Sequence, residues 1–274
     1  MKIVKFLKKF LQSRSLSFSY YSITGNYSAE LKCYNWKGHK VYYRAGKADA
    51  GTIFEILIRP SRVLHANRLF RTGRKLEYWT PPELTPKVIL DIGGNIGTTS
   101  VYLSEMFPDA KIYTFEPVKD NYTILEKNTE SLPNVTTFNV GLGAKDCTPI
   151  IYSEIDQDNT GGFSLYDLDT DKNQGQQITV KNVNNFFKEN NITNVDFIKI
   201  DTEGAEYDIL TSMDSAMLSN VSWIIGELHG ERDFELLNYL SKWFDLDINK
   251  SIRSRLHNFN ARNKSVADLI PWSR

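Results

Sequence analysis

The stretch from Val88 to Gly97, with the sequence VILDIGGNIG, constrains the fold of this chain more than any other. Three apolar residues lead into Asp91, a glycine-rich turn follows, and residues 98–107 have the apolar spacing of a helix. This order predicts a buried parallel strand, a tight turn and a helix N-terminus. Such an arrangement brings backbone N–H groups and the positive end of a helix dipole to a ligand.

The spacing of the glycines separates two classes of cofactor. A dinucleotide-binding fingerprint that ends at Gly97 requires a glycine at position 92, where this sequence has Ile92. The pattern acid-x-Gly-x-x-x-Gly, typical of S-adenosylmethionine enzymes, instead fits Asp91, Gly93 and Gly97. Asn95 takes a position often held by glycine, and asparagine tolerates positive φ. We expect these residues to bind S-adenosylmethionine, and a glycine turn in another doubly wound domain is the alternative.

A second strand and its last residue support the same cofactor. Residues 111–116 (KIYTFE) are predicted to form a buried strand, and Glu116 follows Asp91 by about 25 residues. In nucleotide-binding α/β units, an acid at this place accepts hydrogen bonds from the ribose hydroxyls. After a third strand over residues 135–143, Asp146 lies in the loop where the adenine edge is expected. Asp146 is predicted either to accept from the exocyclic amine or to be a turn residue.

Two later strands, over residues 195–200 and 222–230, lead into polar side chains. These side chains are Asp201 and Glu203 after the first strand, and Glu227 and His229 at the end of the second. Sequential strands usually lie side by side, and residues two apart share a face. We therefore expect four polar side chains to converge on one crevice at the carboxyl ends of the strands. Glu203 is equally suited to cap the following helix, because acids favour a helix N-terminus.

The chain resembles the FkbM family of S-adenosylmethionine-dependent methyltransferases over about residues 49–230. The motifs that carry this resemblance are Asp91–Gly97, Phe115–Pro117, Lys199–Glu206 (KIDTEGAE) and Glu227–His229. The third motif is the most specific. The resemblance implies a Rossmann-like, doubly wound α/β sheet of seven strands with the last strand antiparallel. It also implies methylation of a hydroxyl on a sugar, glycan or small metabolite.

Methyl transfer from a sulfonium requires alignment of donor and acceptor and removal of the acceptor's proton. His229 is the candidate base because the ordinary pKa of histidine is near neutrality, with Glu227 orienting it or Asp201 acting instead. Asp201 and Glu203 are also suited to hold the cationic donor or substrate hydroxyls, and Lys199 is expected to contact substrate or to be structural. As a second mechanism, Asp201, Glu227 and His229 offer ligands for Mg²⁺, which would acidify the acceptor hydroxyl.

The composition limits the partners and the compartment. The 274 residues contain 33 Lys and Arg against 33 Asp and Glu, which argues against a nucleic-acid partner. Cys33 and Cys147 lie far apart without metal spacing, so neither a disulfide framework nor a zinc site is indicated. A reducing, cytoplasmic setting is the default expectation. The expected partner is a small-molecule or glycan acceptor.

The first twelve residues predict a basic amphipathic helix. Its apolar stripe consists of Ile3, Val4, Phe6, Leu7, Phe10 and Leu11. Four lysines lie on the other side of the helix. No apolar run in the chain is long enough to span a bilayer, but a helix over residues 1–12 suits peripheral contact with an anionic membrane. A terminal helix packed on its own domain is the alternative.

Residues 1–86 are expected to form an N-terminal helix and a small α/β extension, followed by the methyltransferase domain over residues 87–274. Within the extension we predict a connector over 13–28, a hairpin over 31–44, and a strand or helix over 52–58. A group of prolines before position 87 marks the boundary.

Two polar segments have predicted contacts with substrate. Residues 59–74 carry five arginines, which form either a solvated helix face or a wall for an anionic substrate. Residues 148–181 contain two strand-like runs around a long polar loop. Such a long loop in a compact domain is usually functional or disordered, and Gly161–Phe163 supplies hinge and lid residues for substrate gating.

A different class of function stays open, namely a non-catalytic cofactor-binding or membrane-recruited partner module of the same fold. The intact residues Asp91, Gly93, Gly97 and Glu116 argue against loss of the cofactor. An oxidoreductase is disfavoured because Ile92 breaks the dinucleotide fingerprint.

Overall fold

The computed structural model describes most of the chain. The described residues are 2–24, 30–45, 47–59, 80–153, 163–164, 175–229, 232–250 and 257–272. Two predictions fall largely outside them, those for the arginine-bearing segment over 59–74 and for the lid glycines Gly161 and Gly162.

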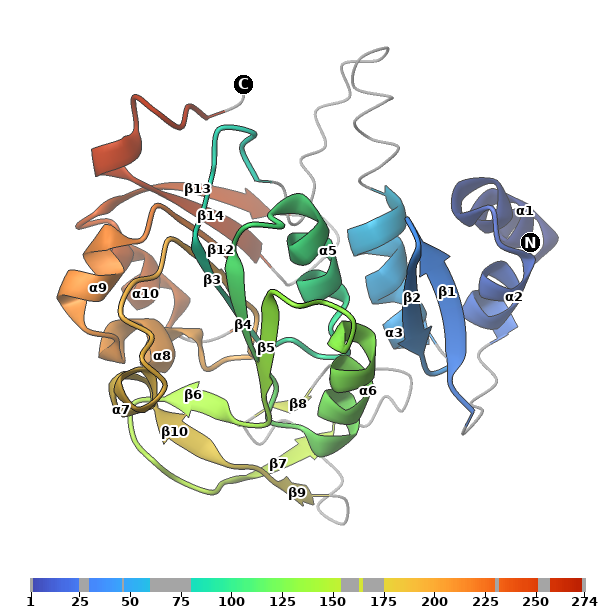
Figure 1. The fold of residues 1–274 in the computed structure, drawn as a ribbon, viewed down its shortest axis with the longest axis horizontal. Coiled ribbons are helices and arrows are strands. Elements are labelled where there is room, and N and C mark those ends of the chain that lie inside the picture. Colours follow the sequence, from blue (N-terminus) through green and yellow to red (C-terminus); the bar gives the residue numbers. More distant parts are fainter. Residues whose placement is uncertain are drawn as a thin grey trace.

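A seven-stranded sheet forms the centre of the described structure (Figure 1). Its strands lie in the order β13, β14, β12, β11, β3, β4 and β5. Their bounds are β3 Val88–Ile92, β4 Lys111–Phe115, β5 Val135–Phe138, β11 Phe197–Ile200, β12 Trp223–Leu228, β13 Phe244–Lys250 and β14 His257–Asn263. The strands from β12 to β5 run parallel, and β14, the last described strand, is antiparallel to β12. The predicted seven-stranded α/β sheet is confirmed.

Helices cover both faces of this sheet. Their bounds are α5 Thr98–Met106, α6 Lys119–Thr129, α7 Val183–Glu189, α8 Glu206–Ser212, α9 Ser215–Asn220 and α10 Asp233–Leu240, and a short 3₁₀ helix η2 spans Lys264–Val266. Helices α5 and α6 lie on one face, and α7 to α10 lie on the other (Figure 1).

Alternate residues of the central strands enter two separate hydrophobic clusters. Ile89, Phe197 and Trp223 belong to the cluster on the α5 side, whereas Leu90 and Ile198 belong to the cluster on the α8 side. Side chains of a strand alternate between the two faces of a sheet, so a strand covered on both sides is apolar at successive positions. This burial on both faces explains why the parallel strands are continuous apolar runs in the sequence.

The N-terminal extension contains two helices, a hairpin and a further helical segment. Their bounds are α1 Lys2–Ser13, α2 Leu16–Thr24, β1 Lys32–Trp36, β2 His39–Tyr43, α3 Lys47–Ile53 and the π-helix η1 Phe54–Ile58. The predicted hairpin is present, and its turn residues Lys37 and Gly38 both have positive φ, 50° and 95°. Residues 52–58, for which the periodicity allowed strand or helix, are helical.

The prediction of a connector over residues 13–28 is wrong, because α2 occupies its middle. The serines and tyrosines of this segment suggested a loop, but Phe18 is fully buried against the hairpin. Its ring centroid lies 4.9 Å from that of Tyr34. Tertiary packing of one aromatic side chain therefore holds a helix that local composition does not favour.

The extension shares a hydrophobic cluster with the sheet. Ile53 and Leu57 belong to the same cluster as Ile89. Asn128 of α6 adds a polar connection, since its Nδ2 donates to the carbonyl of Tyr42 at 2.9 Å and to that of Ile96 at 2.7 Å. The domain boundary at residue 86 stays a prediction.

The predicted third strand over residues 135–143 is two strands in different sheets. Strand β5 belongs to the large sheet, whereas β6 (Gly141–Gly143) pairs with β10 (Val180–Asn182). Between them, Asn139 Nδ2 donates to the carbonyls of Glu116 and Pro117 at 2.9 and 3.1 Å, which turns the chain toward β6. A three-stranded sheet lies beyond, formed by β7 (Ile150–Ser153), β8 (Phe163–Ser164) and β9 (Gly175–Gln177).

Among the described residues, no helix is long and apolar enough to cross a membrane. Helix α1 packs one face on the extension, where Lys9 Nζ lies 5.3 Å from the ring centroid of Phe54. On its other face Val4, Leu7 and Leu11 are 70, 50 and 65% exposed. These three residues are spaced by three and four and therefore form one stripe. Peripheral membrane contact through residues 1–12 stays a prediction, and this stripe is the surface on which it depends.

Replacing Leu7 and Leu11 together by glutamate should reduce binding to vesicles that contain anionic phospholipid. Both the apolar contact and the positive charge of α1 are weakened. Cosedimentation with vesicles measures the effect, and vesicles of neutral phospholipid test the electrostatic part. Phe234 and Leu269, which are also exposed but lie outside α1, provide a matched double glutamate variant. Equal binding by all three proteins would contradict the prediction.

Candidate active site

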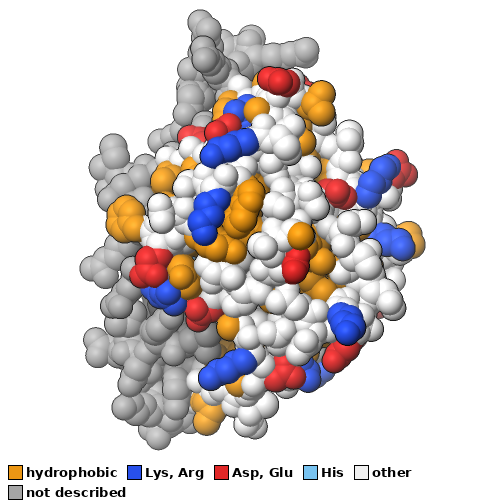
Figure 2. Space-filling view, turned by 90° about the vertical axis from the view of Figure 1, so that its left-hand side faces the viewer, with side chains coloured by type: hydrophobic (Ala, Val, Ile, Leu, Met, Phe, Trp, Pro, Cys, Tyr) orange, Lys and Arg blue, Asp and Glu red, His pale blue; other side chains and the backbone are white. Residues whose placement is uncertain are grey.

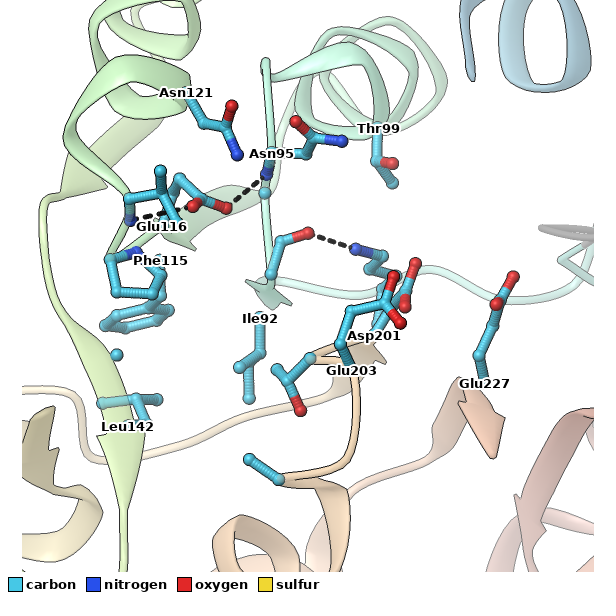
Figure 3. A pocket seen from close by; sticks show the side chains of 18 of the residues that line it. Ile92, Asn95, Thr99, Phe115, Glu116, Asn121, Leu142, Asp201, Glu203 and Glu227 are labelled. Carbon is cyan, nitrogen blue, oxygen red and sulfur yellow. Dashed lines mark hydrogen bonds between the residues drawn. The ribbon is translucent and has the colours of Figure 1, made fainter. Parts of the chain in front are cut away.

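A cavity of about 320 Å³ lies where the order of the parallel strands reverses. Strands β4 and β5 follow β3 on one side, whereas β11 and β12 lie on the other side of β3. The loops after β3 and β11 therefore diverge, and open α/β sheets bind ligands at such a point, at the carboxyl ends of the strands. Residues that follow β3, β4 and β11 line this cavity (Figure 3).

The glycine turn after β3, residues 93–97, is held by close backbone contacts. Gly93 has a φ of 82° and Asn95 a φ of 48°, so the asparagine adopts the left-handed conformation expected of it. The N–H groups of Gly93 and Gly94 both donate to the Phe115 carbonyl, at 3.0 and 2.9 Å. A Cβ atom on Gly93 would lie 1.8 Å from the carbonyl oxygen of Asp201. Only glycine fits at this position.

Helix α5 begins directly after the turn, with its N-terminus at the cavity. Gly97 has a φ of 82° and precedes Thr98, the first residue of the helix. Within the described part of the chain, the buried atoms Thr98 Oγ1 and Asn95 Oδ1 have no hydrogen-bond partner. Both residues line the cavity. Because buried polar atoms are nearly always paired, these two unpaired oxygens make the N-terminus of α5 a candidate site for a polar ligand.

Asp91 and Lys199 form a buried ion pair beneath the glycine turn. Lys199 Nζ lies 3.2 Å from Asp91 Oδ1 and donates to the Gly93 carbonyl at 2.6 Å. Asp91 Oδ2 accepts from Ser100 Oγ at 2.7 Å. Burial acts to lower the pKa of Lys199, but the charges of Asp91 and Asp201 outweigh it and raise that pKa above its usual value. Asp91 does not line the cavity, so its place in the structure is to fix the turn.

Glu116 lies at the end of β4, beside the glycine turn (Figure 3). Its Oε2 accepts from the N–H of Asn95 at 2.8 Å, and its Oε1 accepts from the N–H of Val118 at 2.9 Å. Burial raises the pKa of Glu116 to about 7, although these two backbone donors act in the opposite direction. Each carboxylate oxygen can accept more than one hydrogen bond. Glu116 therefore supports the turn and can still accept from a ligand in the cavity.

Beyond Glu116 the cavity has an apolar wall. Its side chains are Phe115, Val118, Leu142, Ile151, Ile178 and Val180. Three of the six, Leu142, Ile151 and Val180, come from the small strands after β5, whose position depends on tertiary packing. Asp146, predicted to lie near the adenine or to be a turn residue, is not among the lining residues. It is exposed, and its Oδ1 accepts from the N–H of Asn182 at 2.6 Å, as a turn residue does.

Four carboxylates surround His229 at the other end of the cavity. Its Nδ1 lies 3.2 Å from Glu206 Oε1. Its Nε2 lies 3.3 Å from Glu227, 3.5 Å from Glu203 and 3.7 Å from Asp201. These five residues are termed the acid–histidine cluster. The structure thus brings together the four side chains that the sequence predicts to converge. Figure 3 shows three of them, the carboxylates of Asp201, Glu203 and Glu227, on the side of the cavity away from Glu116.

Glu206, the fifth residue of the cluster, was not predicted as a site residue. Its Oε1 accepts from the N–H of Thr202 at 2.8 Å and from Thr202 Oγ1 at 3.0 Å, and its Oε2 accepts from the N–H of Gly204 at 3.1 Å. It therefore holds a loop in which Glu203 has a positive φ of 55°. The acid was visible in the motif KIDTEGAE, but an acid in the first turn of a helix is common for electrostatic reasons alone.

The cluster changes the protonation of its members. Burial raises the pKa of Asp201 to about 6 and that of Glu203 to about 7. Burial also acts to lower the pKa of His229, but the hydrogen bond with Glu206 and the nearby carboxylates outweigh it and raise that pKa to about 11. When only protein groups surround it, His229 is therefore an imidazolium near neutral pH. The prediction of His229 as the base assumes a pKa near neutrality, and the charges around this imidazole remove that premise.

The N-terminal extension supplies one wall of the cavity. The residues are Ala48, Thr52, Glu55 and Ile56 of α3 and η1. Arg44 connects this wall to the site, since its Nη2 donates to Asp49 Oδ1 and to Asn121 Oδ1, both at 2.9 Å. Asn121 lines the cavity beside Glu116 (Figure 3). The sequence carries no local signal for these contacts, because they join segments about 75 residues apart.

Comparison with known families matches residues 91–261, more than half of the chain, to the methyltransferase FkbM domain. The chain belongs to the FkbM methyltransferase family. The matched region contains the glycine turn, Glu116 and the whole acid–histidine cluster. The resemblance found in the sequence motifs is confirmed.

Individual relatives agree with this family. The chain is 28% identical over 162 residues to Methyltransferase 1 of Beauveria bassiana, covering 51% of this chain and 64% of that protein. It is 25% identical over 155 residues to the hexuronic acid methyltransferase AglP of Haloferax volcanii, covering 53% and 57%. The chain spans less than two thirds of the length of these relatives. Among solved structures, the methyltransferase FkbM of Methylobacillus flagellatus is similar, with 18% identity, a TM-score of 0.45, and coverage of 70% of this chain and 46% of that one.

Replacing Gly93 by alanine should lower the free energy of unfolding by roughly 2–4 kcal/mol, because φ is positive and the added Cβ meets the Asp201 backbone. Urea unfolding followed by circular dichroism measures the change. Gly51→Ala is the matched control, since a Cβ on Gly51 in α3 meets no heavy atom within 4 Å. It should be neutral or slightly stabilising. A similar loss in both variants would show that the turn has no special requirement for glycine.

Proposed function

We propose that this methyltransferase transfers the methyl group of S-adenosylmethionine to a hydroxyl oxygen of a sugar, glycan or small hydroxylated metabolite. One observation carries the proposal. A single cavity joins the glycine turn and Glu116 at one end to the carboxylates of Asp201, Glu203 and Glu227 at the other. The first end fits a nucleoside linked to an amino acid, and the second fits an acceptor with several hydrogen-bond donors.

The residues at the first end fit the parts of S-adenosylmethionine. Its ribose hydroxyls are donors that suit Glu116, and its adenine ring suits the apolar wall beyond. Its carboxylate suits the N–H groups at the start of α5, where Asn95 and Thr98 line the cavity. When bound, the cofactor supplies a sulfonium methyl group, which passes to the acceptor oxygen as the carbon–sulfur bond breaks and its electron pair stays on sulfur.

The acceptor hydroxyl must lose its proton as its oxygen forms the new bond, and Glu203 is placed to accept it. Glu203 lines the cavity, and burial raises the pKa of its carboxyl to about 7, which makes it a stronger base than an ordinary glutamate. Asp201, with its pKa raised to about 6 by burial, is the second acceptor for this proton. His229 orients these carboxylates and does not itself touch the cavity.

Several features support a hydroxylated acceptor. Carboxylates accept hydrogen bonds from hydroxyls, and three of them line this end of the cavity. The relative from Haloferax volcanii is a hexuronic acid methyltransferase, so a sugar acceptor occurs among proteins similar to this chain. Strand β11 is followed by Asp-Thr-Glu, without the Asn-Pro-Pro-aromatic turn that would clamp a planar base amine.

Surface charge supports a small acceptor over a nucleic acid. Lysine and arginine balance aspartate and glutamate over the whole chain. Figure 2 shows basic and acidic side chains interspersed on the face at the left of Figure 1, where α7, α9 and α10 lie. Proteins that bind nucleic acid concentrate basic residues on one face, and the described residues on this face show no such concentration.

Replacing Glu116 by glutamine should weaken the binding of S-adenosylmethionine about tenfold at pH 8, because hydrogen bonds to a charged acceptor are the stronger ones. With its pKa at about 7, Glu116 is charged above that pH and protonated below it. The unchanged protein should therefore bind the cofactor more tightly at pH 8 than at pH 6, and the glutamine variant should show a smaller difference. Isothermal titration calorimetry measures both. Equal dissociation constants would refute the ribose role.

Methyl transfer should yield an O-methyl ether. Incubation with ¹³C-methyl donor and a panel of hydroxylated acceptors, followed by NMR of the product, distinguishes methyl groups on oxygen, nitrogen and carbon. Glu203→Gln should slow transfer about 10²–10⁴-fold and leave cofactor affinity unchanged, whereas the exposed Glu235→Gln should leave both unchanged. A methyl group on nitrogen or carbon would overturn the proposed acceptor. Cofactor binding without transfer to any acceptor would favour the non-catalytic module.

A further inference from the structure

One ring nitrogen of His229 has no hydrogen-bond partner within the residues that the structure describes. The side chain is only 6% exposed, and Nε2 itself is buried. This atom faces carboxylate oxygens of Glu227, Glu203 and Asp201 at 3.3–3.7 Å, close enough for ion pairs with a protonated ring but without the geometry of a regular hydrogen bond. Buried polar atoms without a partner are rare, so Nε2 points to a ligand that the protein groups alone do not supply.

The other ring nitrogen has a fixed partner. His229 Nδ1 and Glu206 Oε1 are hydrogen-bonded at 3.2 Å, and Glu206 is held in turn by Thr202 and Gly204. A carboxylate oxygen accepts, so Nδ1 carries the hydrogen. Binding of a cation would displace the second proton of the imidazolium, which leaves the lone pair of the neutral imidazole on Nε2. A carboxylate behind the imidazole is the usual arrangement that orients a metal-binding histidine.

The distances around Nε2 fit one small cation. Asp201, Glu227 and His229 each offer a ligand atom, and these three atoms lie within 4.8 Å of one another. Neighbouring ligands around a cation with bonds of about 2.1 Å lie about 3 Å apart. The separations of 3.3 Å from Nε2 to Glu227 and 3.7 Å from Nε2 to Asp201 are close to this value. Small movements of the two carboxylates would complete the geometry.

The charge of the cluster favours the same conclusion. Four carboxylates lie within 3.7 Å of one imidazole. Lys199 is already engaged with Asp91 and the Gly93 carbonyl, and His229, when protonated, contributes a single positive charge among the four carboxylates. Bringing buried carboxylates this close together is costly unless positive charge lies among them. A divalent cation in place of the imidazolium proton would supply twice that charge at the point where the carboxylates converge.

We propose that Asp201, Glu227 and His229 bind a divalent cation of the Mg²⁺ or Mn²⁺ class at the edge of the cavity. Carboxylate oxygens with a single imidazole suit such ions, and the two cysteines of the chain are exposed elsewhere. Asp201 and Glu227 line the cavity, so the cation would be within reach of a molecule bound there. Glu206 acts through His229 and is a positioning residue.

The consequence for catalysis rests on the proposed function. A cation at this place would bind the oxygen of the acceptor and lower the pKa of its hydroxyl. The proton would then pass to Glu203, which is not among the proposed ligands. The positive charge would also hold the oxygen at a fixed place relative to the methyl donor.

The test is direct binding of Mn²⁺ to the full chain, without any acceptor. Electron paramagnetic resonance measures free Mn²⁺, whose signal decreases when the ion is bound. We expect one bound ion per chain. Asp201→Asn and Glu227→Gln should each weaken binding at least about tenfold, and Glu206→Gln should weaken it by about the same factor through the imidazole. Excess Mg²⁺ should displace the Mn²⁺.

Asp208→Asn is the matched control, because Asp208 is an exposed acid of α8 outside the cluster. It should bind Mn²⁺ like the unchanged protein, and circular dichroism should show the same fold for every variant. Absence of binding at millimolar Mn²⁺, or binding that is equal in the unchanged protein and in both ligand variants, would overturn the proposal.

Titration with S-adenosylmethionine on the same samples separates this proposal from the proposed function. Cofactor binding without Mn²⁺ binding would overturn the metal site and leave the methyl-transfer proposal intact. Mn²⁺ binding that depends on Asp201 and Glu227, without cofactor binding, would support the metal site and overturn the proposed function.

Discussion

The buried ion pair of Lys199 and Asp91 is the interaction on which the site depends. The two residues lie opposite each other on the neighbouring strands β11 and β3, directly beneath the glycine turn. Because Lys199 also donates to the Gly93 carbonyl, one ammonium group fixes the turn and the end of β11 relative to each other. Removing one partner of such a pair leaves an uncompensated buried charge, at a cost of about 3–5 kcal/mol. Asn95 lies in the turn that this contact helps to fix, and Asp201 directly follows β11.

The two ends of the cavity differ in how their carboxylates are stabilised. Glu116 accepts two backbone N–H groups, so its negative charge is supported by fixed dipoles near the glycine turn. In the acid–histidine cluster Glu206 likewise accepts two backbone N–H groups, but Asp201, Glu203 and Glu227 lie close to one another around Nε2 of His229. Because these negative charges lie close together, a proton or a cation among them lowers their electrostatic repulsion. The end of the cavity at Glu116 suits the uncharged part of a nucleoside, and the end at the acid–histidine cluster suits acid–base chemistry.

The residues that the sequence alone identifies are those whose role depends on residues close to them along the chain. Short continuous runs of apolar residues predict the parallel strands, and the glycine spacing predicts the turn with Asn95 at positive φ. The turn of the hairpin at Lys37 and Gly38 follows from the same preference for positive φ. Asp201 and Glu203 were found because an acid directly after a buried strand lies at the ligand-binding edge of a parallel sheet.

Sequence by itself thus determined the fold class, the glycine turn and the acids at the strand ends, because backbone sterics and strand periodicity act over a few residues. Tertiary structure decided which distant groups meet. It placed Glu206 behind His229, moved Asp146 away from the cavity, and added the wall from α3 and η1. It also decided the protonation of His229, since the pKa of a buried imidazole depends on the charges packed around it and these come from separate strands and loops.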